Sequence, residues 1–279
     1  MHEQIAECFK RNLEIIKINL FDRLLFRPLD QKVIQHCVYQ CCKKNTILKY
    51  KHEGRYPFMP LFGCTEFASA IFSLLNLFTN TYGYFKYLHR IKGTSTLCMY
   101  YKLTYLVNVF TWLSSTLFHI NDTNLTRNLD YFFALLNLMV SFYTAFLRIL
   151  VIFYKKDEKI LFKKTVFGIL FSYYFMHIYY LTYIHFNYDL HKMICAFLIV
   201  TILCMYGFIA YSYKMYPHVK YLLISGMAIF FSCLVEIGDT PPLFYLFDSH
   251  ACFHLITGIF APSFYVFLRE DLIFLKKLK

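Results

Sequence analysis

Residues 193–213 read MICAFLIVTILCMYGFIAYSY, a run without any Asp, Glu, Lys or Arg. A helix needs about 20 predominantly apolar residues to cross the hydrocarbon core of a bilayer, and this run has that length. The whole chain has the same character, since 58% of its 279 residues are hydrophobic, 21% are aromatic and only 16% are charged. A soluble domain of this length is much less apolar. The sequence therefore predicts an integral membrane protein.

Six further stretches are similarly apolar. With the first, they lie at 61–84, 97–120, 128–153, 162–183, 193–213, 220–237 and 250–273. Residues 1–60 are more polar, so the chain divides into an N-terminal segment, 1–60, and a transmembrane domain, 61–279. The predicted fold class is all-α: a polytopic membrane protein of seven transmembrane helices preceded by a polar segment.

The formal net charge is +12. No basic helix with interleaved aromatic residues stands out, so we expect no nucleic-acid partner. Instead, the cations follow alternate links and the tail, which the positive-inside rule assigns to the cytosol. The links near 121–128, 184–192 and 238–249, and with them the N-terminal segment, are then lumenal. The cytosolic cations are Lys86, Arg90 and Lys92; Lys155, Lys156, Lys159, Lys163 and Lys164; Lys214 and Lys220; and Lys276, Lys277 and Lys279.

Two short strings far apart in the sequence carry the residues of greatest chemical interest. Ser115 and His119 are four residues apart, and so are His250 and His254. Residues with this spacing lie on one face of a helix. Seven spans place the end of the second, the start of the third near Asp130 and the start of the seventh on the same side. We therefore expect all five residues to meet at one membrane depth.

Three neutral imidazoles with an open fourth position form a common catalytic zinc arrangement. Asp130 would serve as general base, and Ser115 would form a hydrogen bond with a developing oxyanion or with the metal-bound water. Ordinary explanations remain open for four of these residues. His119 and His250 are also typical of solvated helix ends, Ser115 of a bond to the carbonyl one turn back, and Asp130 of a charge that the helix dipole favours.

Ten cysteines are present. Most fall in or beside apolar spans, where a cysteine is usually a small buried hydrophobe. Four lie in the N-terminal segment and are expected to pair if that segment is lumenal; these are Cys8, Cys37, Cys41 and Cys42. No feature of the sequence indicates an oligomeric state.

Three blocks of sequence resemble the Per1-like family of post-GPI-attachment remodelling proteins. They are Gly54-Arg-Tyr-Pro-Phe58 with Glu66-Phe-Ala-Ser69; Trp112-Leu-Ser-Ser-Thr-Leu-Phe-His119 with Leu129-Asp-Tyr-Phe132; and Glu236-Ile-Gly-Asp-Thr-Pro-Pro-Leu-Phe244 with His250 and His254. That family is similar to alkaline ceramidases and adiponectin receptors, which are heptahelical membrane hydrolases.

The resemblance implies a GPI-specific phospholipase A2 of the endoplasmic reticulum or Golgi, with its active site facing the lumen. Such an enzyme removes the sn-2 acyl chain from the membrane lipid of GPI-anchored proteins. By resemblance, His119, His250 and His254 bind Zn²⁺, while Ser115 and Asp130 are the active-site serine and aspartate. The N-terminal segment departs from the family, because Val33 stands where a first cysteine is expected before Cys37 and Cys41, and Met1 is not followed by a signal peptide.

Two other functions compete with this interpretation. A ceramidase-like lipid amidase would use the same metal site, although the first block and the Asp239-Thr-Pro-Pro string favour the GPI branch. A heptahelical receptor or scaffold would use the histidines for packing alone. Metal analysis separates the scaffold from the two enzymes, and lipid analysis separates the enzymes from each other.

Overall fold

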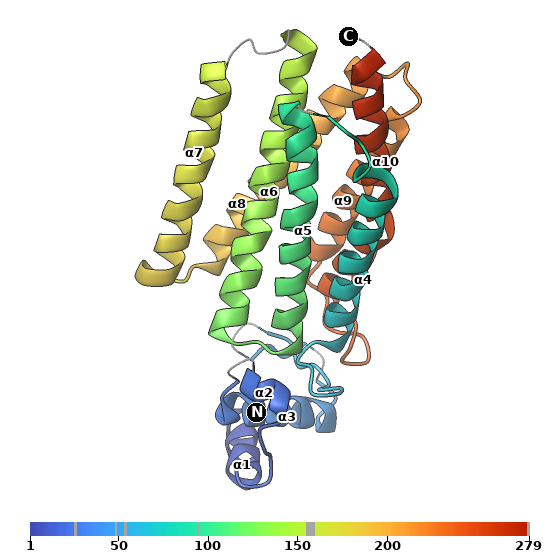
Figure 1. Cartoon of the computed structure of the whole chain (residues 1–279). Helices are drawn as coiled ribbons and strands as arrows, with labels where there is room; N and C mark the ends of the chain where they lie inside the picture. Colours follow the sequence, from blue (N-terminus) through green and yellow to red (C-terminus); the bar gives the residue numbers. More distant parts are fainter. Residues whose placement is uncertain (25–26, 48, 53–54, 94, 155–159, 278–279) are drawn as a thin grey trace. The chain divides into compact units, whose positions relative to one another are not determined.

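The computed structural model describes residues 1–24, 27–47, 49–52, 55–93, 95–154 and 160–277. Every regular element of this described part is a helix (Figure 1). The long helices are α4 (Phe67–Gly83), α5 (Thr96–Ile120), α6 (Asn124–Phe153), α7 (Ile160–Tyr179), α8 (Tyr188–Ser212), α9 (Val219–Ile237) and α10 (Ser249–Lys277). Short π-helices, η1 (Tyr84–Leu88) and η2 (Tyr180–Ile184), continue α4 and α7.

The predicted fold class is confirmed: the chain is an all-α polytopic membrane protein. Each of the seven apolar stretches overlaps one of the long helices. Among the described residues, α6, α8, α9 and α10 are long and apolar enough to cross a membrane by length and composition. The count of seven spans stays a prediction. Lys155, Lys156, Lys159, Lys279 and Gly54, on which part of the sequence argument depended, lie outside the described residues.

Helix α4 begins at Phe67 rather than at residue 61. Residues 61–64 instead form a tight turn, in which the Cys64 N–H donates to the Leu61 carbonyl at 2.8 Å. Gly63 in this turn has a φ of +80°, which a residue without a Cβ adopts at little cost. Apolar composition alone does not distinguish such a turn from the first turns of a helix.

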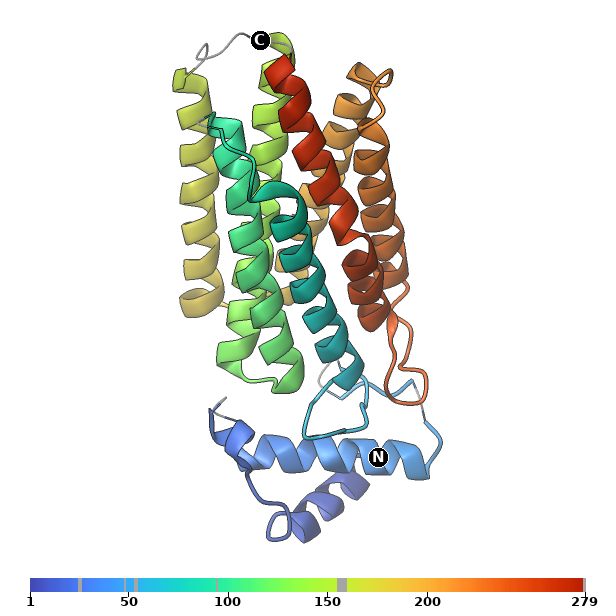
Figure 2. The ribbon, with the colours of Figure 1, turned by 45° about the vertical axis from the view of Figure 1, so that its right-hand side comes forward.

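The N-terminal segment contains three helices, α1 (His2–Asn12), α2 (Leu20–Leu24) and α3 (Leu29–Lys44). Figure 2 shows α3 lying crosswise to the beginning of α4, with α1 packed against it. A disulfide joins Cys8 in α1 to Cys37 in α3, while Cys41 and Cys42 are buried free thiols. Val33 is fully buried in the apolar cluster that these helices share.

The chain forms two compact units, and several helices contribute to both. The first unit comprises residues 1–76, 112–130 and 231–258, and the second comprises 77–111, 131–230 and 259–279. The first therefore holds the N-terminal helices together with the end of α5, the end of α9 and the beginning of α10. All five predicted site residues belong to the first unit.

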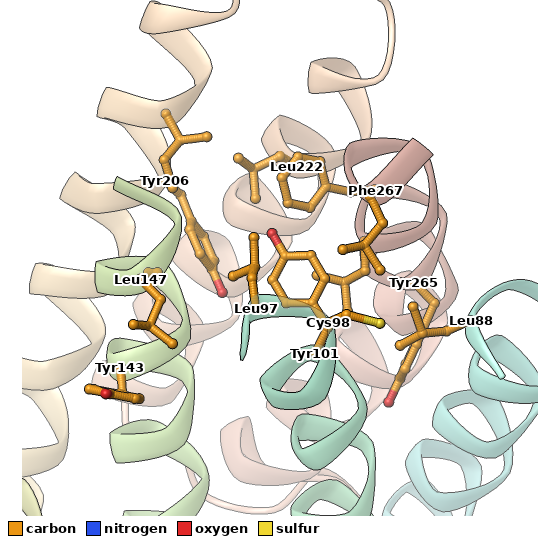
Figure 3. Packing of buried hydrophobic residues seen from close by; sticks show 14 of the residues in the cluster. Leu88, Leu97, Cys98, Tyr101, Tyr143, Leu147, Tyr206, Leu222, Tyr265 and Phe267 are labelled. Carbon is orange, nitrogen blue, oxygen red and sulfur yellow. The ribbon is translucent and has the colours of Figure 1, made fainter. Parts of the chain in front are cut away.

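The second unit contains the largest apolar core, which is rich in tyrosine and leucine (Figure 3). Gly83 permits a close helix contact here, because a Cβ at this position would lie 2.5 Å from the Tyr265 ring. Any side chain larger than hydrogen would force α4 and α10 apart in this unit. The residues of this apolar core that Figure 3 labels are Leu88, Leu97, Cys98, Tyr101, Tyr143, Leu147, Tyr206, Leu222, Tyr265 and Phe267.

A buried ion pair also belongs to the second unit. Arg148 of α6 donates from Nε and Nη2 to the Asp271 carboxylate of α10 at 2.8–3.0 Å, and Tyr101 of α5 donates its hydroxyl to the same carboxylate at 2.8 Å. The Arg148 and Asp271 side chains are only 1% and 0% exposed. This pair therefore links three helices through complementary charges and hydrogen bonds.

Candidate metal centre

Three histidine side chains from two helices converge in the first unit. His119 is the last but one residue of α5, and His250 and His254 are in the first two turns of α10. The Nε2 atom of His254 lies 3.2 Å from that of His119 and 2.9 Å from that of His250. His119 and His254 are buried and His250 is partly exposed. The structure therefore brings together all three predicted metal ligands.

Two carboxylates contact the Nδ1 atoms of the His119 and His250 rings, on the side away from the converging Nε2 atoms. Glu66 Oε2 lies 2.7 Å from Nδ1 of His119, and the Glu236 carboxylate lies 3.1–3.2 Å from Nδ1 of His250. A carboxylate that accepts the Nδ1 proton fixes the tautomer, so that the unprotonated Nε2 faces away from it. Both rings consequently present a lone pair toward the point where the three Nε2 atoms meet.

The backbone holds Glu66 beside the histidine that it orients. Glu66 directly precedes α4, and its N–H donates to the His119 carbonyl at 2.9 Å. The neighbouring Thr65 N–H donates to the Ile120 carbonyl at 3.0 Å. These two bonds join the segment before α4 to the end of α5. They therefore hold the Glu66 carboxylate next to the His119 imidazole.

His254 is held through its backbone and by an aromatic ring. Asn76 of α4 donates from Nδ2 to the His254 carbonyl at 2.6 Å. Gly258, one turn further along α10, leaves room for this amide, because a Cβ there would lie 3.1 Å from Asn76 Nδ2. The Trp112 ring meets the His254 ring edge to face, with centroids 5.3 Å apart. Among the described residues, the buried Nδ1 of His254 has no hydrogen-bond partner.

Ser115 and Asp130 lie beside the histidines. The buried Ser115 hydroxyl is 3.0 Å from the Ser73 hydroxyl of α4 and also hydrogen-bonds to the Asp130 carboxylate. Asp130 is half-buried, and the charges of His119 and His250 act on its carboxyl group. Because α6 begins at Asn124, Asp130 is beyond the first turn, where the helix dipole favours an acidic residue. Its proximity to Ser115 and the histidines is then the better explanation of its position.

Acidic groups outside the long helices respond to the same cluster. Burial alone would raise the pKa of the Glu66 carboxyl. The hydrogen bond and charge of His119 and the charge of Arg55 outweigh burial, so the pKa falls to about 2. The pKa of Asp248, which directly precedes α10, is raised by burial and by the charge of Glu66. The cluster therefore keeps Glu66 ionised, as a hydrogen-bond acceptor for a metal-bound histidine requires.

The donor set fits a divalent metal ion. Nitrogen ligands placed tetrahedrally at about 2.0–2.1 Å from zinc are about 3.3 Å apart, and two of the Nε2 separations are 2.9 and 3.2 Å. A hydrogen bond between two imidazoles explains one short separation, and the three imidazole nitrogens, which all lie within 4.8 Å of one another, form a donor set that suits a divalent cation. Imidazole nitrogen suits several divalent ions, including zinc.

Sequence reasoning missed three residues of this site. Glu66 and Glu236 appeared only within family blocks, and Ser73 was given no role. The one usable signal for Glu66 is an acidic residue placed directly before an apolar run. Ser73 carries no such signal, because a serine within a spanning helix usually bonds its own backbone.

Comparison with known proteins finds relatives that match most of the chain. The Per1-like family matches residues 24–272. Post-GPI attachment to proteins factor 3 of Drosophila melanogaster is 26% identical over 272 residues, covering 93% of this chain and 82% of that protein. The GPI-specific phospholipase A2-like PGAP3 of Danio rerio is 30% identical over 251 residues, covering 84% and 75%, and that of Homo sapiens is 26% identical over 252 residues, covering 86% and 76%.

No solved structure matches the chain significantly. The family match includes the whole of α3 to α9 and most of α10, and so every residue of the histidine cluster and its carboxylates. The resemblance seen in the sequence blocks is confirmed, and the chain belongs to the Per1-like family.

Proposed function

We propose that this protein remodels GPI anchors as a metal-dependent hydrolase, which cleaves the sn-2 acyl ester in the lipid of GPI-anchored proteins. The names of its relatives, GPI-specific phospholipase A2-like, support the substrate class and the reaction. The observation that carries the proposal is the meeting of three Nε2 atoms, two of whose rings are oriented by Glu66 and Glu236. Such an arrangement is typical of a metal site built for hydrolysis.

His119, His250 and His254 would hold the metal, which we propose to be zinc. A zinc ion with these ligands would supply a Lewis acid that polarises the ester carbonyl and lowers the pKa of water to about 7. Glu66 and Glu236 hold the His119 and His250 rings in the tautomer that presents Nε2. Trp112 and Asn76 restrict the position of His254.

Asp130 and Ser115 would act on the reacting atoms. The Asp130 carboxylate accepts a proton from the attacking water and returns it to the glycerol oxygen that leaves, so that one water yields a free fatty acid and a lyso-lipid. The Ser115 hydroxyl donates a hydrogen bond to the oxyanion that develops on the ester carbonyl. Ser73 keeps the Ser115 hydroxyl in place through the 3.0 Å bond between the two oxygens.

The proposed setting is the lumenal side of the endoplasmic reticulum or Golgi membrane. Disulfides persist in oxidising compartments, and the Cys8–Cys37 bond therefore supports a lumenal location for the segment 1–60. Lys163, Lys164 and Lys214 support the cytosolic location of the opposite links. The catalytic domain would then be residues 61–279, with its site near the lumenal surface.

Fatty-acid release from a defined substrate tests the proposal. Purified protein is incubated in detergent with a GPI lipid that carries an isotopically labelled sn-2 chain, and the free fatty acid is measured by mass spectrometry. Wild type should release labelled fatty acid and leave a lyso-lipid. Asp130→Asn should lower the rate by about 100-fold or more, because general base catalysis contributes about 10²–10⁴-fold.

His177→Ala provides the matched control. His177 is also a buried histidine, but it belongs to the second unit and bonds to His191 at 3.1 Å. This variant should retain the wild-type rate. Release from the sn-1 position, cleavage of a ceramide amide in preference to the ester, or equal rates in wild type and Asp130→Asn would each refute the proposed reaction.

A further inference from the structure

The surroundings of the histidine cluster are strongly acidic. Six carboxylates belong to the segments that form it or directly adjoin it in the first unit: Glu66, Asp122, Asp130, Glu236, Asp239 and Asp248. A GPI lipid carries a negatively charged phosphodiester. An anion that approaches so many carboxylates is repelled unless a cation offsets them. The proposed substrate therefore requires a positive group near the site in addition to any metal.

Arg55 is a cation in the required place. Its guanidinium lies 5.4 Å from the centroid of the Phe118 ring, and the Phe118 and His119 rings are neighbours with centroids 5.1 Å apart. Arg55 forms an ion pair with Asp122, just after α5, and its charge acts on Glu66. One phenyl ring thus separates the guanidinium from a proposed metal ligand.

The segment 55–66 holds Arg55 against both parts of the chain that carry the histidines; Figure 2 shows this segment as the light blue loop between α3 and α4. At one end, the Tyr56 hydroxyl donates to the Asp239 carbonyl at 2.8 Å, and Met59 N–H donates to the Tyr245 carbonyl at 2.9 Å, in the loop that precedes α10. At the other end, Glu66 bonds to the His119 carbonyl. Arg55 is therefore placed relative to His119, His250 and His254 alike.

Arg55 retains donors for a second anion. The Arg55 side chain is 38% exposed, whereas the Asp122 side chain beneath it is only 10% exposed. A guanidinium has five N–H donors, and one carboxylate engages at most two of them in a bidentate pair. The remaining donors form a planar fork that matches a phosphate group.

We propose that Arg55 binds the phosphodiester of the lipid substrate and thereby positions the sn-2 ester at the histidine cluster. This inference rests on the proposed function. In a glycerophospholipid, the phosphate and the sn-2 ester are on adjacent carbons, so a cation beside the cluster holds the ester next to it. Arg55 is thus a specificity residue for anionic glycerophospholipids over neutral diacylglycerols.

Binding of non-hydrolysable lipids tests this role independently of catalysis. The purified full-length holoprotein is titrated in nonionic detergent with dialkyl ether phosphatidylinositol and with dialkylglycerol, which lacks the phosphate. Arg55→Ala should raise the Kd for the phosphatidylinositol ether by about tenfold or more, because a charge-assisted hydrogen bond is lost. The Kd for dialkylglycerol should change by less than about twofold, and Arg55→Lys should lie between wild type and Arg55→Ala.

Two controls separate binding from a structural effect. Lys49→Ala removes an equal charge from an exposed residue nearby and should leave both Kd values unchanged. Asp122→Asn breaks the ion pair but keeps the guanidinium, so it should maintain or strengthen phosphatidylinositol binding. If Asp122→Asn and Arg55→Ala weaken both lipids alike, Arg55 is only structural. If Arg55→Ala changes neither Kd, the inference is also wrong.

The result of this binding test is independent of the result of the fatty-acid release test. Fatty-acid release from ester lipids by the same preparations tests hydrolysis, whereas the ether lipids test recognition of the phosphate. A protein that binds the phosphatidylinositol ether through Arg55 but releases no fatty acid would refute the proposed reaction alone.

Discussion

The Arg148–Asp271 pair of the second unit and the histidine cluster of the first bury ionisable side chains in opposite ways. In the second unit, Arg148 and Asp271 carry opposite charges, and the Tyr101 hydroxyl donates a hydrogen bond to the Asp271 carboxylate. In the first, three histidines direct like atoms toward one point, and the carboxylates stand behind the rings. Burying charge is costly unless it is paired. Complementary groups therefore indicate a structural link, and convergent lone pairs indicate a cation site.

Removing a convergent ligand should have the largest effect. We expect His254→Ala to lose bound metal and to lower fatty-acid release by more than 100-fold, since even residues behind the ligands contribute about 10–100-fold. Inductively coupled plasma mass spectrometry and the labelled-lipid assay measure the two quantities. Full metal content in this variant would mean that the three nitrogens do not act as one site.

Breaking the complementary pair should affect stability instead. Asp271→Asn leaves the Arg148 charge buried without compensation, so we expect the free energy of unfolding to fall by about 3–5 kcal/mol. Denaturant titration in detergent measures this change. Tyr101→Phe, which removes one hydrogen bond to the carboxylate, should cost only about 1.5–3 kcal/mol. Loss of metal from folded Asp271→Asn would erase the distinction between the two units.

Carboxylates behind the ligands should give an intermediate effect. We expect Glu66→Gln to weaken metal affinity by about 10–100-fold, because the neutral amide accepts the His119 Nδ1 proton more weakly and its NH2 group can also donate to the other tautomer. Glu236→Gln should weaken it less, since Glu236 and His250 are 34% and 35% exposed and water replaces the lost acceptor. Competition with a chromogenic chelator measures both affinities. A larger effect of Glu236→Gln would indicate that the burial of the carboxylate does not decide which substitution weakens metal binding more.

The smallest effect should come from Ser73. Ser73→Ala removes the hydrogen bond to Ser115, which is worth about 0.5–1.5 kcal/mol, so fatty-acid release should fall by a few-fold. Metal content should stay at the wild-type level, because the hydrogen bond of the Ser73 hydroxyl is to Ser115, which is not one of the proposed metal ligands. A loss of metal here would place Ser73 in the ligand support rather than beside the reacting ester.

Much of the fold follows from local composition. Each long helix was predicted because apolar runs of about 20 residues are recognisable without tertiary information. The start of α4 was misplaced by six residues, since the turn at 61–64 is as apolar as the helix that follows it. Pairing of Cys8 with Cys37, rather than with Cys41 or Cys42, was also beyond the pattern, because the packing of α1 on α3 selects the partner.

The sequence by itself determined the membrane class, the helical runs and the spacing that stacks His250 on His254, because these properties depend on neighbours within one or two turns. Only the tertiary structure decided that His119 meets His254, 135 residues away, and that Glu66 and Ser73 support the site. Contacts over such distances depend on how whole helices pack, and residue spacing carries no information about that packing.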